Sequence, residues 1–333
     1  MPEEKYARQW TRRLRARLLS GLYVDLNRDY RNSIFLAGSG RSGTTWVSDI
    51  INYKNEYRYV FEPFHPDKVE ICKHFEHKQY LRPEDRREEF LRPARTIFSG
   101  ELRSRWADRF HSRFVVRRRL IKDIRANLML GWIRTNFPEM PIIFLLRHPC
   151  AVANSKIKLG WKPDMDEFLS QGELVEDFLK PSEGEVRSAK TDFERHVFSW
   201  CVESYVPLAQ LRRGEVHLAF YENLCEDPEG EVGRLFTFLD KDFNESVFER
   251  MKKPSLLSRE GSAVLLGERL ADSWRKHVTA AQLKRAVEIL SLFGLDAVYS
   301  EEAMPDAGGA LALMGTDRNA KAPSERGRKR FEP

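Results

Sequence analysis

Residues 33–51 carry the sequence SIFLAGSGRSGTTWVSDII, in which three local patterns follow one another. An apolar run of strand length comes first, a turn rich in glycine, serine and threonine follows, and an apolar segment of helical spacing ends the stretch. Small residues let backbone N–H groups approach a phosphate, and a helix that begins there directs its partial positive charge at the same anion. The stretch therefore predicts an anion-binding loop between a strand and a helix.

Three further segments have the composition of buried strands. Residues 142–146 and 216–220 are apolar runs, and residues 120–122 form a shorter one. Strands that alternate with helical patterns build parallel sheets covered by helices. We therefore predict an α/β fold with a P-loop-like central parallel sheet and helices on both faces.

Composition divides the 333-residue chain into three parts. Residues 1–31 are basic and predict a helical N-terminal extension, residues 32–300 hold the strand and helix patterns of one domain, and residues 301–333 contain only Phe331 as an aromatic residue. A segment so poor in large apolar residues cannot offset the entropy of ordering, so we expect a disordered tail. The apolar stripe of the extension consists of Trp10, Leu14, Leu18 and Leu22.

The charge of the chain limits the kinds of partner that it can bind. The net charge of +6 favours an anionic ligand or surface. Twelve arginines in residues 82–119 are interpreted mostly as a solvated helix face. No nucleic-acid-binding motif accompanies them, so we expect no nucleic-acid partner, whereas residues 1–31 can make loose contact with a membrane surface.

Targeting features point to the cytoplasm. The chain has no run of about 18 apolar residues that would span a membrane and no apolar signal-peptide core near its beginning. Its four cysteines lie far apart and form no CxxC pair, which suits free thiols in a reducing compartment. We therefore expect a cytoplasmic protein without signal peptide or transmembrane helix.

The glycine-rich loop differs from a nucleotide-hydrolase loop at one position. Gly38 and Gly43 have the Walker spacing, but Thr44 stands where the lysine for the β- and γ-phosphates belongs, and Arg41 is the cation of the loop. We expect a loop that binds a phosphate without transferring one from ATP. A P-loop kinase or NTPase remains the alternative.

Four segments together resemble sulfotransferases that use 3′-phosphoadenosine 5′-phosphosulfate (PAPS). Residues 41–46 are similar to the 5′-phosphosulfate loop, and residues 147–155 are similar to the segment that binds the 3′-phosphate. Residues 221–228 and 274–277 are similar to two later blocks of the family, the last one weakly. The resemblance spans roughly residues 32–295 and implies the sulfotransferase fold, a PAPS-dependent enzyme, PAP as the product and no metal.

The resemblance also implies roles for individual residues. Arg41 would contact the bridging and leaving oxygens, Thr44 and Thr45 the 5′-phosphosulfate, and Arg147 with Ser155 the 3′-phosphate. Trp46 and Tyr221 are candidates for an adenine shelf, with burial in the core as the alternative for each. The complete set of expected donor-binding residues is Arg41, Ser42, Gly43, Thr44, Thr45, Trp46, Arg147, Ser155, Tyr221, Arg269 and Trp274.

The expected general base is a carboxylate. Cytosolic family members have a histidine where this chain has Ile124, although Lys122 is kept and can contact the sulfuryl group. Glu62 lies 21 residues after Arg41 in a Phe-Glu-Pro segment similar to that of carbohydrate sulfotransferases. We predict Glu62, Arg41 and Lys122 as catalytic residues, with the pKa of Glu62 raised by its aromatic and proline neighbours.

Two sets of alternatives stay open. Glu62 can instead be a structural carboxylate paired with an arginine, in which case Asp123 or His65 is the reserve base. The expected reaction is in-line transfer to an acceptor hydroxyl on a carbohydrate or glycolipid, with a tyrosyl or natural-product hydroxyl as the alternative. We expect residues 62–119 and 157–195 to select the acceptor, and the resemblance allows a homodimer.

Overall fold

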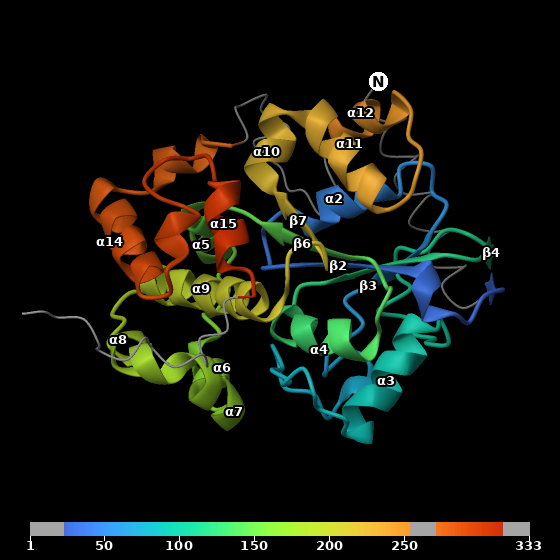
Figure 1. Ribbon diagram of the computed structural model, residues 1–333, viewed down its shortest axis with the longest axis horizontal. Helices are drawn as coiled ribbons and strands as arrows, with labels where there is room; N and C mark the ends of the chain where they lie inside the picture. The colour runs from blue at the N-terminus through green and yellow to red at the C-terminus, as the bar shows by residue number, and fades with distance from the viewer. Residues whose placement is uncertain (1–22, 254–270, 316–333) are drawn as a thin grey trace, which may run out of the picture.

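The computed structural model describes residues 23–253 and 271–315. Its centre is a five-stranded sheet in the order β3-β5-β2-β6-β7, and all paired neighbours run parallel (Figure 1). The fully buried strand β2 occupies the middle of this sheet. The strands are β2 (Ser33–Gly38), β3 (Arg58–Phe61), β5 (Arg119–Asp123), β6 (Ile142–Leu146) and β7 (His217–Phe220).

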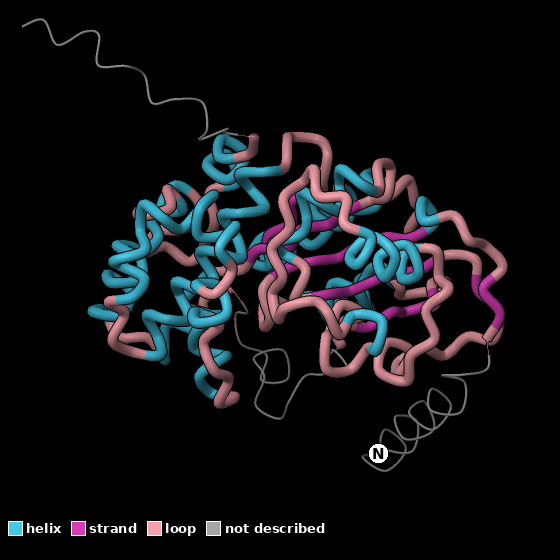
Figure 2. The backbone as a smooth tube through the Cα atoms, turned by 90° about the horizontal axis from the view of Figure 1, so that it is seen from below, coloured by secondary structure: helices cyan, strands magenta, loops and turns pink. Residues whose placement is uncertain are grey.

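Helices cover both faces of the sheet, as the sequence predicts (Figure 2). Successive residues of a strand point to opposite faces. Ile34 and Leu36 accordingly pack in one apolar cluster, whereas Phe35 and Ala37 belong to the other. The first cluster includes residues of α2 (Thr44–Ile51), α10 (Tyr221–Glu226), α11 (Pro228–Phe238) and α12 (Ser246–Met251); the second includes residues of α3 (Glu88–Phe98), α4 (Leu130–Asn136) and α9 (Asp192–Gln210).

A group of helices gathers at one end of the sheet (Figure 1). The 19-residue α9 lies at its centre and starts with a capping box between Thr191 and Glu194. It packs against α5 (Pro149–Lys158) and α14 (Ala280–Ser291), so it supports the helix that follows β6. The remaining elements are α5 (Pro149–Lys158), α6 (Met165–Leu169), α7 (Gly172–Leu174), α8 (Glu183–Arg187), α14 (Ala280–Ser291), α15 (Ala307–Leu313), β1 (Val24–Asp25), β4 (Val115–Val116), η1 (Tyr30–Asn32), η2 (Glu70–Cys72), η3 (Asn127–Met129), η4 (Val175–Leu179), η5 (Lys180–Ser182), η6 (Ser273–His277) and η7 (Leu295–Ala297).

The structure corrects the expected ends of the domain. Residues 1–22 lie outside the described residues, but the last part of the expected helical extension contains strand β1, which pairs with β4. At the other end, α15 continues the fold beyond residue 300, and its Ala310 is fully buried. Disorder from residue 301 is therefore wrong for residues 301–315, because alanine and glycine allow this short helix to pack closely.

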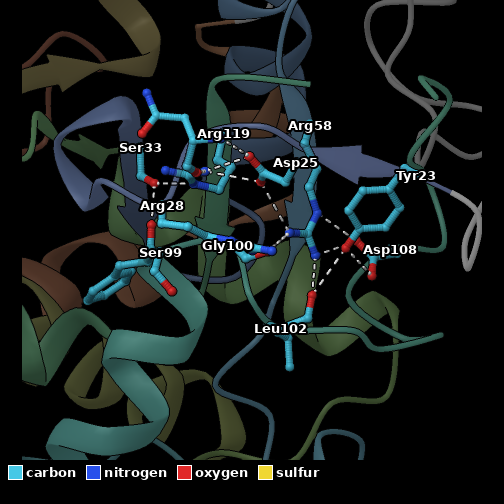
Figure 3. A network of polar contacts seen from close by, with 12 residues as sticks. Tyr23, Asp25, Arg28, Ser33, Arg58, Ser99, Gly100, Leu102, Asp108 and Arg119 are labelled. Atoms are coloured by element: carbon cyan, nitrogen blue, oxygen red, sulfur yellow. Dashed lines mark hydrogen bonds and ion pairs between the residues drawn. The ribbon is translucent and has the colours of Figure 1, made fainter. Parts of the chain in front are cut away.

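Two buried arginines hold the edge of the sheet at which the strands begin (Figure 3). Arg58, at the start of β3, forms an ion pair of 2.9 Å with Asp108 and donates a hydrogen bond of 2.9 Å to the carbonyl of Gly100. Arg119, at the start of β5, forms an ion pair of 3.0 Å with Asp25 in β1. Arg119 is thus an exception to the solvated helix face expected for the arginine-rich segment, because its guanidinium has enough partners to be buried.

Within residues 23–253 and 271–315, no helix has the length and apolarity needed to cross a membrane.

Candidate active site

The edge at which the five strands end collects the chemically active residues. In a parallel sheet all carboxyl ends lie at the same edge, and the loops after them form the common place for a ligand. The register pairs Gly38 with Leu145 and Phe61 with Lys122, so neighbouring strands end almost level. The residues that end or follow the strands here are Gly38, Glu62, Asp123, Arg147 and Tyr221.

The loop after β2 has the form of an anion cradle. Gly43 has φ 97°, a left-handed conformation that favours glycine, and it precedes the first turn of α2 without a side chain to cap that turn. The hydroxyl of Ser42 is buried and has no hydrogen-bond partner among the described residues. Unused N–H groups and an unpaired hydroxyl in one loop fit a bound phosphate or sulfate group.

Arg41, Arg147 and Ser155, which the resemblance assigns to the donor, come together beside this loop. Arg41 donates a hydrogen bond of 3.0 Å from Nε to Oγ of Ser155 in α5. Arg147 donates one of 3.1 Å from Nη1 to the carbonyl of Arg41, and its buried Nε has no hydrogen-bond partner in the described part of the chain. Two guanidinium groups and a hydroxyl therefore face one region from three separate elements.

The aromatic candidates divide into two groups. The rings of Trp46 and Tyr221 lie 5.5 Å apart next to the loop, and the guanidinium of Arg147 lies 4.1 Å from the centre of the Tyr221 ring. Both rings are buried in the core, as the alternative for each expects, and Trp46 Nε1 donates a hydrogen bond of 3.1 Å to the carbonyl of Met251. Trp274 is also buried, and it stacks at 4.1 Å on His148, the residue after Arg147. The structure thus places Trp274 behind the segment that carries Arg147, in contrast to the expected donor contact. Arg269 lies outside the described residues.

Glu62 is held between two cations. Lys122 Nζ donates to one carboxylate oxygen at 2.7 Å, and Arg125 Nη1 donates to the other at 2.6 Å. Burial raises the pKa of Glu62, but the two cations outweigh burial and bring the pKa below its ordinary value. The expected rise in pKa is therefore wrong, because the sequence does not reveal that Arg125 turns back towards Glu62. The predicted pairing with an arginine occurs, and it leaves Glu62 ionised at neutral pH.

The two reserve bases have different surroundings. Asp123 is fully buried, its carboxylate accepts hydrogen bonds from the backbone N–H groups of Phe64 and Arg125, and burial raises its pKa. Asp123 therefore fixes the backbone at Phe64, two residues after Glu62, and at Arg125, whose side chain pairs with Glu62. Burial lowers the pKa of His65 to about 4, so its imidazole is neutral near pH 7.

A second buried group of charges adjoins the site and was missed in the sequence. Lys78 Nζ forms an ion pair with Glu203 of α9 and donates a hydrogen bond of 2.8 Å to the carbonyl of Ile124. Lys156, next to Ser155, has its Nζ 3.7 Å from the same carboxylate. The helical spacing of apolar residues around Glu203 places this glutamate on the buried face of a long helix. A buried carboxylate without a partner would be costly, so this position could have indicated buried lysine partners.

Trp161 is the other residue that sequence reasoning missed. Its side chain is unusually open for a tryptophan, with 41% of the residue exposed. A Cβ atom on Gly40 would lie 2.7 Å from this ring and 3.3 Å from Cδ1 of Ile124. The aromatic ring therefore packs over the anion loop next to the residue that replaces the family histidine.

A family model and a curated relative are similar to this chain. Residues 33–245 match a family model described as the sulfotransferase family. The chain is 26% identical over 320 residues to nodulation protein NoeE of Sinorhizobium fredii, which covers 90% of this chain and 72% of that protein.

Solved structures with a detectable similarity are more distant. The sulfotransferase domain from the curacin biosynthetic pathway is 16% identical with a TM-score of 0.42 and covers 81% of this chain and 98% of that domain. Mouse sulfotransferase SULT7A1 complexed with PAP is 15% identical with a TM-score of 0.39 and covers 83% of this chain and 86% of its own. Both TM-scores are below 0.5, so neither similarity bears on the ligands of this chain.

The Gly43→Ala variant tests the conformation of the loop. The left-handed φ and the approach of the new Cβ to 2.7 Å from the Tyr221 ring should cost at least about 1–2 kcal/mol of unfolding free energy, measured by urea titration. The matched control is Gly233→Ala, which adds its Cβ to open space in helix α11 and should stabilise by about 0.5–1 kcal/mol. Equal stability of Gly43→Ala and the wild type would contradict the loop geometry.

Proposed function

Because this chain belongs to the sulfotransferase family, we propose that it transfers the sulfuryl group of PAPS to a hydroxyl group of a carbohydrate or glycolipid. The observation that carries the proposal is the shared edge of the sheet. The anion loop, the Arg41–Ser155–Arg147 group and the Glu62–Lys122 pair all lie there. Donor binding, charge stabilisation and proton removal can thus occur side by side.

The unused polar groups of the loop support PAPS as the donor. A 5′-phosphosulfate fits the N–H groups at the start of α2 together with the hydroxyls of Ser42, Thr44 and Thr45. The 3′-phosphate fits Arg147 and Ser155, since a guanidinium fork and a hydroxyl both donate to phosphate oxygens. The Tyr221 ring lies against Gly43 of the loop and the Trp46 ring lies 5.5 Å from it, which makes these two rings the candidates for contact with the nucleobase.

The mechanism assigned to these residues is an in-line displacement. PAPS supplies an activated sulfuryl group whose bond to the 5′-phosphate oxygen breaks as the acceptor oxygen bonds to sulfur. Glu62 accepts the proton of the acceptor hydroxyl, and Arg41 and Lys122 stabilise negative charge on the sulfuryl and leaving oxygens. Arg125 and Lys122 hold Glu62 in its ionised form, the form that can take up a proton.

The surroundings of Trp161 favour a sugar as acceptor. A sugar ring offers an apolar face and several hydroxyls, so it is recognised by an aromatic surface next to fixed polar groups. Trp161 presents such a surface over Gly40, and the carboxylates of Asp164 and Glu167 follow within the next two short turns of chain. The Phe-Glu-Pro segment around Glu62 points the same way by its resemblance to carbohydrate sulfotransferases.

Binding of PAP tests the donor site. Calorimetry without Mg²⁺ should show micromolar binding to the wild type, at least tenfold weaker binding to Arg147→Ala, and unchanged binding to Arg86→Ala, which removes an exposed arginine. ATP with Mg²⁺ is the competing ligand and should bind much more weakly than PAP. Preference for ATP and Mg²⁺, or no PAP binding by the wild type, would favour a P-loop kinase or NTPase instead, whereas equal PAP affinity in all three proteins would exclude Arg147 from the donor site.

Transfer of label from ³⁵S-PAPS identifies the acceptor class. Candidate acceptors are a free oligosaccharide, a lipid-linked oligosaccharide, a tyrosine-containing peptide and a simple phenol. We expect label in a sugar and a KM for that sugar at least about fivefold higher in Trp161→Ala, because the variant loses the aromatic surface. Phe114→Ala, which removes another exposed ring, is the control. Label only in the peptide or the phenol would contradict a sugar acceptor.

The variant Glu62→Gln tests the base with whichever acceptor is labelled. Loss of proton removal should lower kcat by about 10²–10⁴-fold while PAP affinity stays near that of the wild type. Because the pKa of Glu62 lies below its ordinary value, wild-type kcat/KM should stay level from neutral pH down towards pH 5 and fall only at lower pH.

Two controls separate chemistry from folding in this experiment. Glu84→Gln changes an exposed glutamate and should keep full activity. Glu62→Asp keeps a carboxylate for Lys122 and Arg125, so it should fold like the wild type and recover part of the rate. Normal turnover by Glu62→Gln would exclude Glu62 as the base.

A further inference from the structure

Three potential metal ligands lie together just beyond Glu62. One ligand atom each of His65, Asp67 and His77 lies within 4.8 Å of the other two. Nε2 of His77 is 3.0 Å from Oδ2 of Asp67, and the rings of His65 and His77 meet edge to face with centres 5.5 Å apart. None of the three takes part in the Glu62, Lys122 and Arg125 contacts.

Burial gives the group an unsatisfied nitrogen. His65 is 6% exposed, and its Nδ1 has no hydrogen-bond partner in the part of the chain that the structure describes. A buried polar atom without a partner costs about 1–3 kcal/mol, so such an atom in a folded protein calls for an explanation. A cation shared with Asp67 and His77 would give the imidazole of His65 a partner.

The charges around the group also suit a cation. Among the described residues, the ion pair of Asp67 is with His77, and Glu167 forms no ion pair with a lysine or arginine. Burial and the neighbouring carboxylate of Asp164 raise the pKa of Glu167, whereas His77 and Lys78 act in the opposite direction. Arg125, the cation that acts on His65, is already bound to Glu62. Asp67 is thus the carboxylate of the group that would balance the charge of a bound cation.

We propose that His65, Asp67 and His77 bind one divalent transition-metal ion of the Zn²⁺ class. Two imidazoles and one carboxylate suit Zn²⁺, Co²⁺ or Ni²⁺, whereas Mg²⁺ and Ca²⁺ prefer oxygen ligands. Closing to ligand distances of about 2.0–2.2 Å requires the exposed side chain of Asp67 and the partly exposed side chain of His77 to move inward. Three protein ligands leave a further coordination position open.

Such an ion would cross-link the segment that joins the two buried charge groups. This segment runs from Glu62 to Lys78, and η2 is the one regular element that the structure assigns within it. At one end of the segment the carboxylate of Glu62 accepts a hydrogen bond from Lys122. At the other end Lys78 donates a hydrogen bond to the carbonyl of Ile124. The metal therefore holds the two flanking charges in place, and its binding does not depend on the proposed sulfuryl transfer.

The test uses the full chain without a histidine tag, stripped with a chelator that is then removed. Titration with Co²⁺ should give visible ligand-field absorption that saturates at one equivalent and is displaced by Zn²⁺. The thermal unfolding midpoint should rise with Zn²⁺, because an ion that binds only the folded state stabilises it. Absence of a saturable Co²⁺ band, or equal stabilisation by Mg²⁺, would overturn the proposal.

Substitutions of two proposed ligands, with a nearby histidine as control, test where the ion binds. His77→Ala and Asp67→Ala should each weaken Zn²⁺ binding at least tenfold in calorimetry, whereas His74→Ala, on an exposed position of the same segment, should leave it unchanged. Both ligand variants change side chains that are at least partly exposed, so they should fold. Zn²⁺ affinity that survives His77→Ala, or that falls equally in His74→Ala, would contradict this ligand set. PAP binding, measured in parallel, reports separately on the donor site.

Discussion

The parallel arrangement of the sheet around β2 is the constraint on which the rest of the site depends. Parallel strands bring all of their carboxyl ends to one edge, so residues 38, 62, 123, 147 and 221 meet although they are spread over most of the chain. The opposite edge is closed by the buried Arg58 and Arg119. Any change in strand order would separate the anion loop from Glu62 or from Arg147.

Buried charge is the second feature that shapes this protein. The Glu62–Lys122–Arg125 and Lys78–Glu203–Lys156 groups both lie beside the anion loop. Desolvation of ions is expensive, and well-packed apolar residues would often stabilise a fold as well or better. These two buried charge groups are better explained by the side-chain positions that their ion pairs fix around the site than by a gain in stability. Ionic pairing lowers the pKa of Glu62, so this carboxylate is a weaker base but is ionised throughout the neutral range.

Much of the fold could be predicted from local patterns. The strand-like runs at 33–37, 120–122, 142–146 and 216–220 all overlap observed strands, because the strands of a sheet covered by helices carry mostly apolar side chains. The strand β3 escaped prediction because its four residues begin with Arg58, a residue that is buried only thanks to carboxylate and carbonyl partners far along the chain. The helix α15 was not predicted because its small residues bury little apolar surface by themselves, and the sequence does not show the surface against which they pack.

The sequence by itself determined the strand, turn and helix of the anion loop and the parallel α/β class, since these follow from local patterns and from the rule that parallel strands end together. Only the tertiary structure decided the charge state of Glu62, the inward packing of Trp274, the exposure of Trp161 and the grouping of His65 with His77. The reason is physical. A pKa, a buried ion pair or a ring stack depends on which groups lie within a few ångströms, and segments distant in sequence or joined by irregular chain set those distances.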